Sequence, residues 1–81
     1  MDKLVPIYID RKEHKSPEHT NGAALHVLGG INPETHDLWR EEEGRKDDEL
    51  IPNNLDPIHL KKEWIHFYSS QKDLNPGSHG K

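Results

Sequence analysis

Cysteine is absent from this chain of 81 residues, and so are long apolar runs. Without cysteine there is no disulfide scaffold, no thiolate metal site and no cysteine nucleophile, so the fold has to be held by packing alone. No stretch approaches the roughly 20 apolar residues of a membrane helix. The start, Met1–Asp10, lacks the hydrophobic segment of a signal peptide. We therefore expect a protein of the reducing cytoplasm, with no membrane partner.

Positive charge is scarce too, because 11 Lys and Arg residues stand against 15 Asp and Glu residues, for a net charge of -4. Such a chain repels phosphate backbones and has no basic stripe, so nucleic acid is not an expected partner. The carboxylates gather in Glu41–Glu43 and Asp47–Glu49. Charge runs in a loop are usually solvated and lack the burial that prepares a pKa for acid-base work. The pattern favours a solvated hairpin tip or an electrostatic docking surface, in a chain that is not an enzyme and has no catalytic residues.

Histidine, by contrast, is plentiful, with seven residues. Zinc sites built from histidine usually place paired ligands about three to five residues apart on one element, with carboxylate support. His14 and His19 come closest to that spacing, but Pro17 lies between them and a loop is the better interpretation. We predict no metal site and no cofactor.

The first part of the chain predicts two strands and a turn. Leu4–Asp10 is rich in β-branched residues that alternate with others, which is typical of a strand, and Pro6 places part of it on an edge or bulge. The polar Asp10–Glu13 predicts a hairpin turn. A short second strand around His14–Ser16 then ends at Pro17.

A single short helix is predicted next, over Ala23–Leu28. Thr20 or Asn21 can cap its start, and the pair Gly29-Gly30 supplies a left-handed stop. Leu25 and Leu28 share one face of it. Because so short a helix is marginal alone, we expect this face to pack on a sheet.

The second part of the chain predicts further strands around a charged loop. The expected elements are a turn at Asn32–Thr35, a strand at Asp37–Glu41, the loop Glu42–Asp48, a brief strand at Leu50–Ile51, a mostly irregular connection at Asn53–Lys62 that anchors Leu55, Ile58 and Leu60, and a last strand at Trp64–Ser69. The order ββαβ(β)β predicts an α+β fold of the β-grasp type, a mixed sheet of four to five strands packed on one short helix. We expect one domain over residues 1–70 and a flexible polar tail over residues 71–81.

In order and spacing, these pieces resemble the prokaryotic multiubiquitin-type domains, a ubiquitin-like β-grasp family found beside bacterial ubiquitin-conjugation enzymes. The pieces that match are Ile7–Lys12, Thr20–Leu25, Leu28–Ile31, Asp37–Trp39, Asp47–Leu50 and Trp64–Tyr68. The resemblance covers about residues 4 to 70. Family members often come as tandem copies, and Lys61–Glu63 stands where a glycine turn is common.

The resemblance implies a protein modifier whose terminal glycine carboxylate is adenylated and joined to a target protein. Gly80 is the candidate conjugation residue, and Lys81 comes directly after it. The implied partners are therefore a processing peptidase that removes Lys81, an activating enzyme and a conjugating enzyme, in systems whose purpose is sometimes antiviral defence. Glycine suits a residue threaded through a narrow site, because it lacks the side chain that would keep the backbone away. In the alternative interpretation, Gly80 is one of the small residues common in frayed termini.

The last strand also predicts a partner-binding surface. Alternation places Ile65 and Phe67 on one face, and Trp64, His66 and Tyr68 on the other. If Leu38 joins the core, Trp39 emerges beside His66 and Tyr68, and an exposed aromatic cluster of this kind commonly marks a partner surface. Two alternatives stay open. Trp39 or Trp64 could fold onto the core or under the connection, or the phase of the strand could be wrong by one residue.

Two classes of function compete, a conjugated modifier and a non-covalent β-grasp module that binds partners through the face of Trp39, His66 and Tyr68. A sulfur carrier of the related β-grasp type is a third, but it usually ends in a bare glycine pair that Gly80-Lys81 does not supply.

Overall fold

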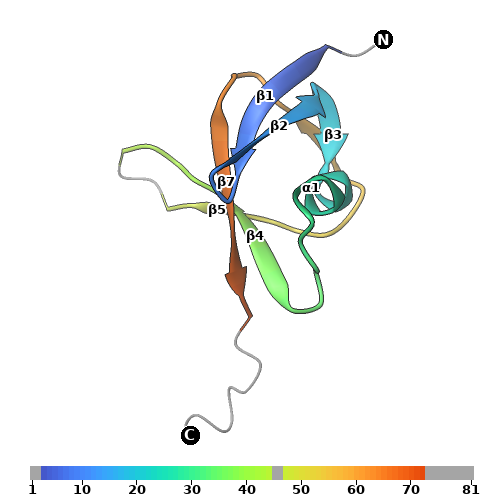
Figure 1. Cartoon of the computed structure of the whole chain (residues 1–81), viewed down its shortest axis with the longest axis vertical. Coiled ribbons are helices and arrows are strands. Elements are labelled where there is room, and N and C mark those ends of the chain that lie inside the picture. The colour runs from blue at the N-terminus through green and yellow to red at the C-terminus, as the bar shows by residue number, and fades with distance from the viewer. Residues whose placement is uncertain (1–2, 45–46, 73–81) are drawn as a thin grey trace, which may run out of the picture.

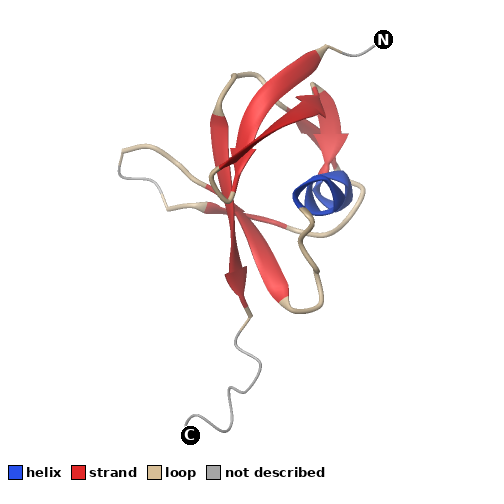
Figure 2. Ribbon diagram, viewed as in Figure 1, coloured by secondary structure: helices blue, strands red, loops and turns tan. Residues whose placement is uncertain are grey.

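The structure is a computed structural model that describes residues 3–44 and 47–72. Within these residues eight elements succeed one another: β1 (Leu4–Ile9), β2 (Lys12–Pro17), β3 (His19–Asn21), α1 (Gly22–Gly29), β4 (His36–Arg40), β5 (Glu49–Ile51), β6 (Pro57–His59) and β7 (Ile65–Gln71). Figure 1 shows their arrangement in space, and Figure 2 shows the helix on one side of the main strands.

A five-stranded mixed sheet forms the body, with strand order β2-β1-β7-β4-β5. The neighbours β1 and β7 run parallel, and the other pairs in this sheet are antiparallel. The first and last strands are therefore central and adjacent. The prediction of a mixed sheet of four to five strands with one short helix is confirmed for the described residues.

The turn between β1 and β2 is tighter than predicted. Asp10 and Arg11 both have positive φ, at 52° and 69°, as a two-residue hairpin turn of the primed type requires. Asp10 is held there by its own carboxylate, which accepts hydrogen bonds from the backbone N–H and the hydroxyl of Ser69 at 2.8 and 2.7 Å. Because only two residues turn, β2 starts at Lys12 and is longer than the predicted His14–Ser16.

The helix forms where the sequence predicts it. Asn21 is the N-cap, its side-chain oxygen accepting from the Ala24 N–H at 2.8 Å. Gly30 ends the helix at φ 68° in the left-handed region. Leu25 is fully buried and Leu28 packs against the core, so these two residues share the inward face.

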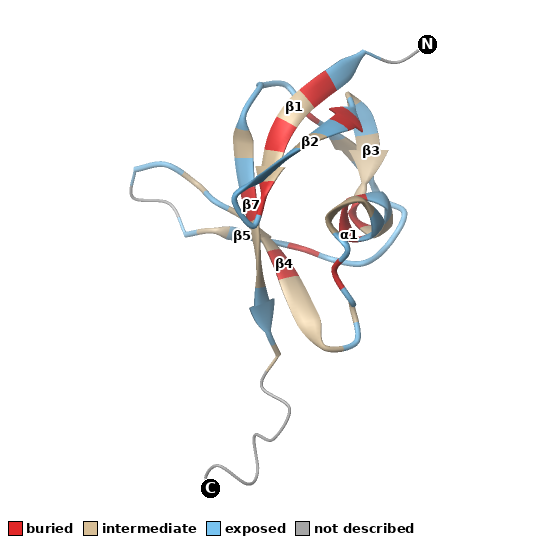
Figure 3. Ribbon diagram, viewed as in Figure 1, coloured by how far each residue is buried: buried red, intermediate tan, exposed pale blue. Residues whose placement is uncertain are grey.

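The core lies between α1 and the sheet face that looks toward it (Figure 3). Its buried hydrophobic residues are Val5, Ile7, Ile9, Leu25, Ile31, Leu38, Ile51, Leu60 and Phe67. Along β1 the buried residues alternate with partly exposed ones, as a half-buried strand requires.

Two short strands lie where the sequence predicts none. β3 and β6 pair antiparallel in a second, two-stranded sheet. β3 is followed directly by α1, which begins at Gly22. The connection predicted as mostly irregular therefore contains β6. Within it Leu60 is buried and Ile58 packs against the core, but the prediction for Leu55 is wrong, because 77% of this residue is exposed.

The last strand begins one residue later than predicted and runs to Gln71. Trp64 stays outside it at φ 61°, in the left-handed region. The predicted tail, with Gly80 and Lys81, lies outside the described residues apart from Gln71 and Lys72. Among the described residues, no helix is long and apolar enough to cross a membrane.

Candidate functional site: the outer face of the sheet

The sheet has a second face, turned away from α1, that carries most of the large aromatic side chains. We call it the outer face and define it by Tyr8, Trp39, Leu50, Trp64, His66 and Tyr68. No element within residues 3–44 and 47–72 covers it as α1 covers the inner face (Figure 2). The strand order builds it, because β5, β4 and β1 each contribute one residue and β7 contributes two, with Trp64 directly before β7.

Strand register brings these residues side by side. Trp39 on β4 pairs with Tyr68 on β7 and with Leu50 on β5. Tyr8 on β1 pairs with His66 on β7 across the parallel ladder. Directly opposed residues point to the same side of a sheet, so Leu50, Trp39 and Tyr68 form a row, which continues from His66, two residues before Tyr68 on β7, to Tyr8 on β1.

The aromatic rings at one end of the row are in contact. The Tyr8 ring centroid lies 4.8 Å from that of His66 and 5.2 Å from that of Trp64. Both distances are in the range where aromatic rings attract beyond simple area burial. Trp64 reaches this place because its backbone N–H donates to the Pro6 carbonyl at 2.7 Å. The cluster is therefore fixed from both β1 and the segment before β7.

Of the four residues predicted for partner binding, Trp39, His66 and Tyr68 occupy the outer face as their alternation predicts. The Trp39 indole N–H donates to the Ser70 hydroxyl at 3.0 Å, so the ring is held along β7 rather than turned into the core. Trp64 is 43% exposed, so it is not covered by the connection between β5 and β7. It lies on the outer face from the segment directly before β7. The phase of β7 is as predicted, since Phe67 is buried and His66 exposed. The binding role of these residues stays a prediction.

Two residues of the outer face were missed from the sequence. Tyr8 could have been found, because it alternates with the buried Ile7 and Ile9 in β1. The position of Leu50 was harder to predict, because the sequence of a three-residue strand does not show which side chain points outward.

Two carboxylate residues, Asp48 and Glu41, lie beside the outer face. Asp48 accepts hydrogen bonds from the Tyr68 hydroxyl and, at 3.0 Å, from the Glu42 backbone N–H. These two bonds lower the pKa of the Asp48 carboxyl, and the bond to Asp48 raises the pKa of the Tyr68 hydroxyl. Glu41 is placed by its backbone N–H, which donates to the His66 carbonyl at 2.8 Å.

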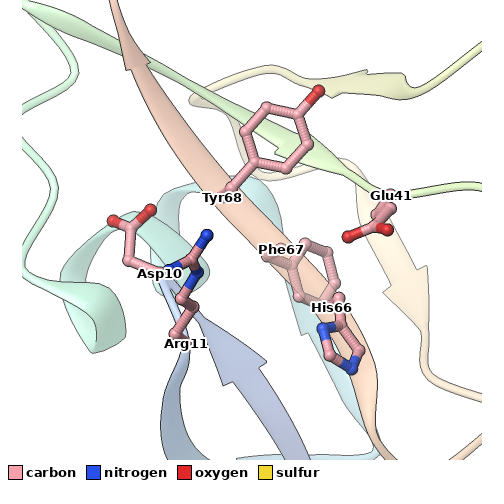
Figure 4. Close-up of a pocket in the computed structure, with 6 residues that line it drawn as sticks. All are labelled: Asp10, Arg11, Glu41, His66, Phe67 and Tyr68. Atoms are coloured by element: carbon pink, nitrogen blue, oxygen red, sulfur yellow. The ribbon is translucent and has the colours of Figure 1, made fainter.

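A hollow of ≈ 460 Å³ lies over the middle of β7. Figure 4 shows Asp10 and Arg11 on one side of the strand and Glu41 on the other, with His66 and Tyr68 carried between them. Its lining is mostly polar or charged. The hollow extends the outer face past the end of β1.

A separate histidine pair lies on the second sheet. The rings of His19 and His59 stack with centroids 4.5 Å apart. His59 Nε2 is 2.9 Å from a Glu18 carboxylate oxygen, and this hydrogen bond lowers the pKa of Glu18. The sequence spacing pointed to His14 and His19, whereas strand register pairs His19 with His59. Among the described residues, no group of three or more His, Cys, Asp or Glu side chains is placed to hold a metal ion.

Comparison of the chain with protein-family models, with curated proteins and with solved structures found no match.

Proposed function

We propose that this chain is a ubiquitin-like protein modifier with a β-grasp fold. The observation that carries the proposal is the sheet order β2-β1-β7-β4-β5 with its parallel β1–β7 pair. A β-grasp starts with a hairpin, packs one helix on the sheet and returns its last strand to the centre, parallel to the first. The hairpin β1–β2, the single α1 and the central β7 agree with that plan within the described residues.

The modifier reaction needs a free glycine carboxylate, and we assign it to Gly80. A processing peptidase hydrolyses the Gly80–Lys81 bond, water supplying the hydroxyl of the new carboxylate. The activating enzyme then joins this carboxylate to the α-phosphate of ATP and releases pyrophosphate. A nucleophile carried by the conjugating enzyme or the target displaces AMP and forms the new bond to the Gly80 carbonyl. Gly80 and Lys81 lie outside the described residues, so their role rests on the sequence.

The end of β7 suits a domain that presents its C-terminal segment to partner enzymes. β7 pairs with β1 only over residues 65–67, whereas its pairing with β4 continues to Gln71. The Lys72 N–H then donates to the Thr35 carbonyl at 2.9 Å. The chain therefore leaves the sheet beyond the end of β1, away from the outer-face cluster of Tyr8, Trp64 and His66. Partner enzymes could hold that cluster without covering the point where the tail begins.

Co-expression of the whole chain with the enzymes encoded beside it tests this proposal. We expect intact-mass spectra to show loss of Lys81, and peptide mapping to find Gly80 joined to another protein. Gly80→Val should abolish both processing and adduct formation, because the added side chain blocks close approach of the backbone. Gly77→Val, in the same tail, is the matched control and should keep both. A chain that retains Lys81 and forms no adduct beside active enzymes would exclude the modifier.

The exposed outer face favours a second candidate function, a non-covalent β-grasp module that binds partner proteins. The two candidates respond differently to two variants. Deletion of Gly80 and Lys81 should eliminate modifier activity and leave a binding module intact. Trp39→Ala should weaken a binding module most, since Trp39 lies between Tyr68 and Leu50 in the row.

A further inference from the structure

A second hollow of ≈ 460 Å³ lies at the margin of the outer face. It is lined by residues 40–43, at and after the end of β4, and by residues 62–66, which lead into β7. We call it the Trp64 cleft. Because Trp64 and His66 belong both to this cleft and to the outer face, a partner seated on the outer face also reaches the cleft.

The charge of the Trp64 cleft is negative. Among the described residues, four glutamates line it, at positions 41, 42, 43 and 63, against the two cations Arg40 and Lys62. Arg40 is already engaged, with its Nε 3.3 Å from Glu42 and its Nη1 4.0 Å from Glu49. Glu41, Glu43 and Glu63 are exposed and make no ion pair with another described residue. Because Arg40 is paired with Glu42 and Lys62 offsets one of these three side chains, the described lining has an excess of two negative charges.

Trp64 supplies the other half of the chemistry. Its ring is supported from one side by Tyr8, 5.2 Å away, yet 43% of the residue is exposed. An indole face beside carboxylates attracts cations, because the ring quadrupole and the negative charges act in the same direction. Arginine fits such a place better than lysine, since its planar guanidinium stacks on an aromatic ring and offers paired donors to carboxylates.

We propose that the Trp64 cleft binds an arginine side chain from a basic polypeptide segment that docks on the outer face. This deepens the proposed function and rests on it only for the role of the outer face as a docking surface. A second copy of this chain is a poor occupant, because each copy carries a net charge of -4. Nucleic acid is disfavoured by the same charge.

The test uses the full chain and a fluorescein-labelled peptide of alternating glycine and arginine, with fluorescence anisotropy as the readout at about 0.15 M salt, where the Debye length is about 8 Å. The matched peptide replaces each arginine with citrulline, which keeps the shape and removes the charge. We expect the arginine peptide to bind and the citrulline peptide to bind at least about tenfold more weakly, since a charged partner is central to a cation site.

Protein variants locate the site. The double variant Glu43→Gln/Glu63→Gln should weaken binding about fivefold or more. The control Glu34→Gln/Asp56→Asn has the same change in net charge and should change binding less than about twofold, because these two residues do not line the cleft. Trp64→Leu keeps apolar bulk without the ring and should also weaken binding. Should Trp64→Leu fail to fold, the glutamate variants still decide the question, because exposed side chains are usually tolerant of substitution.

Several results would overturn the inference. Equal binding of the citrulline peptide would exclude a charge-dependent site. Equal losses in the two double variants would place the attraction in overall charge and not in the cleft. If spermine displaces the labelled peptide at the same concentration as the unlabelled peptide does, recognition of a polypeptide is excluded. No conjugation enzyme is present in the peptide-binding experiment, so it is independent of the co-expression experiment. If the peptide binds but co-expression yields no adduct, only the modifier function is refuted. If co-expression yields adducts but the peptide does not bind, only the Trp64 cleft is refuted.

Discussion

At the scale of single residues, Asp48 connects the acidic segment after β4 to the outer face. Its two carboxylate oxygens accept from different elements, one from the Glu42 backbone and one from the Tyr68 hydroxyl on β7. Both bonds favour the charged carboxylate, which is why the pKa of Asp48 is lowered. The same bond holds the proton on Tyr68 and raises the pKa of that hydroxyl.

Tyr68→Phe should raise the pKa of Asp48 toward its ordinary value, because the variant removes the largest cause of the shift. Since the folded-state pKa is below the unfolded one, this carboxyl stabilises the protein above a pH of about 4 and loses that contribution as the pH falls through the folded pKa. The free energy of unfolding of Tyr68→Phe should therefore fall less steeply with acid. NMR titration of the Asp48 carboxyl measures the pKa, and urea unfolding as a function of pH measures the slope.

Tyr8→Phe is the matched control for this prediction, because Tyr8 also lies on the outer face but makes no hydrogen bond to Asp48. It should leave the Asp48 titration unchanged.

At alkaline pH the Tyr68 hydroxyl has the opposite effect from Asp48, because its pKa is raised in the folded state. It stabilises the protein below a pH of about 10, and this contribution is lost as the pH rises through the folded-state pKa of Tyr68. An unaltered Asp48 pKa in Tyr68→Phe would contradict the assigned bond.

Residue alternation predicted Trp39, His66 and Tyr68 on one face, because a period of two needs no knowledge of neighbouring strands. Alternation also placed Trp64 on this face, but it did not predict that Trp64 precedes the strand and adopts φ 61°. The Pro6 carbonyl and the Tyr8 ring stabilise that conformation, and both belong to β1. The Trp64 cleft is likewise formed by two segments more than 18 residues apart, and no local pattern brings them together.

At the scale of elements, α1 is defined by its two ends. Asn21 caps the start and Gly30 ends it in the left-handed region, and both were predictable because these residue types have a known local chemistry. The need for glycine at position 22 was not predictable. A Cβ on residue 22 would overlap the carbonyl oxygen of Pro52. Helix and connection therefore pack backbone to backbone at this point.

Gly22→Ala should destabilise the protein by about 2 kcal/mol or more, in the range of an overpacked core. Helix propensity alone would favour alanine over glycine by about 1 kcal/mol, so the sign of the effect separates the two causes. Asn21→Ala provides the comparison and should cost about 1 kcal/mol through loss of the cap. Urea unfolding monitored by circular dichroism measures both. A Gly22→Ala protein more stable than the parent chain would rule out the close approach.

The elements missed by sequence analysis share one property, which is shortness. β3 and β6 have three residues each, too few for alternation to be visible, and Pro57 opens β6. Their pairing depends on contact between positions about 40 residues apart. The longer β1, β4 and β7 were predicted because each is long enough to show buried residues between less buried neighbours.

At the scale of the whole molecule, stability depends on a small core. A domain of 81 residues has a free energy of unfolding of about 4–12 kcal/mol at the usual 0.05–0.15 kcal/mol per residue. The core lies between α1 and the main sheet. It contains Phe67, the chain's one phenylalanine, which is 2% exposed.

Phe67→Ala should cost about 3–5 kcal/mol, because it removes a large buried side chain and leaves a cavity. Since that is a large part of the total, we expect a measurable unfolded population at 37 °C, seen as a lower thermal midpoint by circular dichroism. Val27→Ala is the control, because Val27 is 81% exposed on α1 and exposed substitutions usually stay within about 0.5 kcal/mol. Equal midpoints for the two variants would show that Phe67 does not anchor the core.

The parallel pairing of β1 with β7 also decides when the chain can fold during its synthesis. β1 emerges from the ribosome before β7, but two of the four strand pairs in the main sheet need β7, more than 50 residues later. At about 5–20 residues per second, translation keeps β1 waiting for several seconds. Its apolar residues are then open to chaperones or to other nascent chains. The main sheet is thus completed only after β7 has been synthesised, and chains terminated before residue 65 lack its central strand.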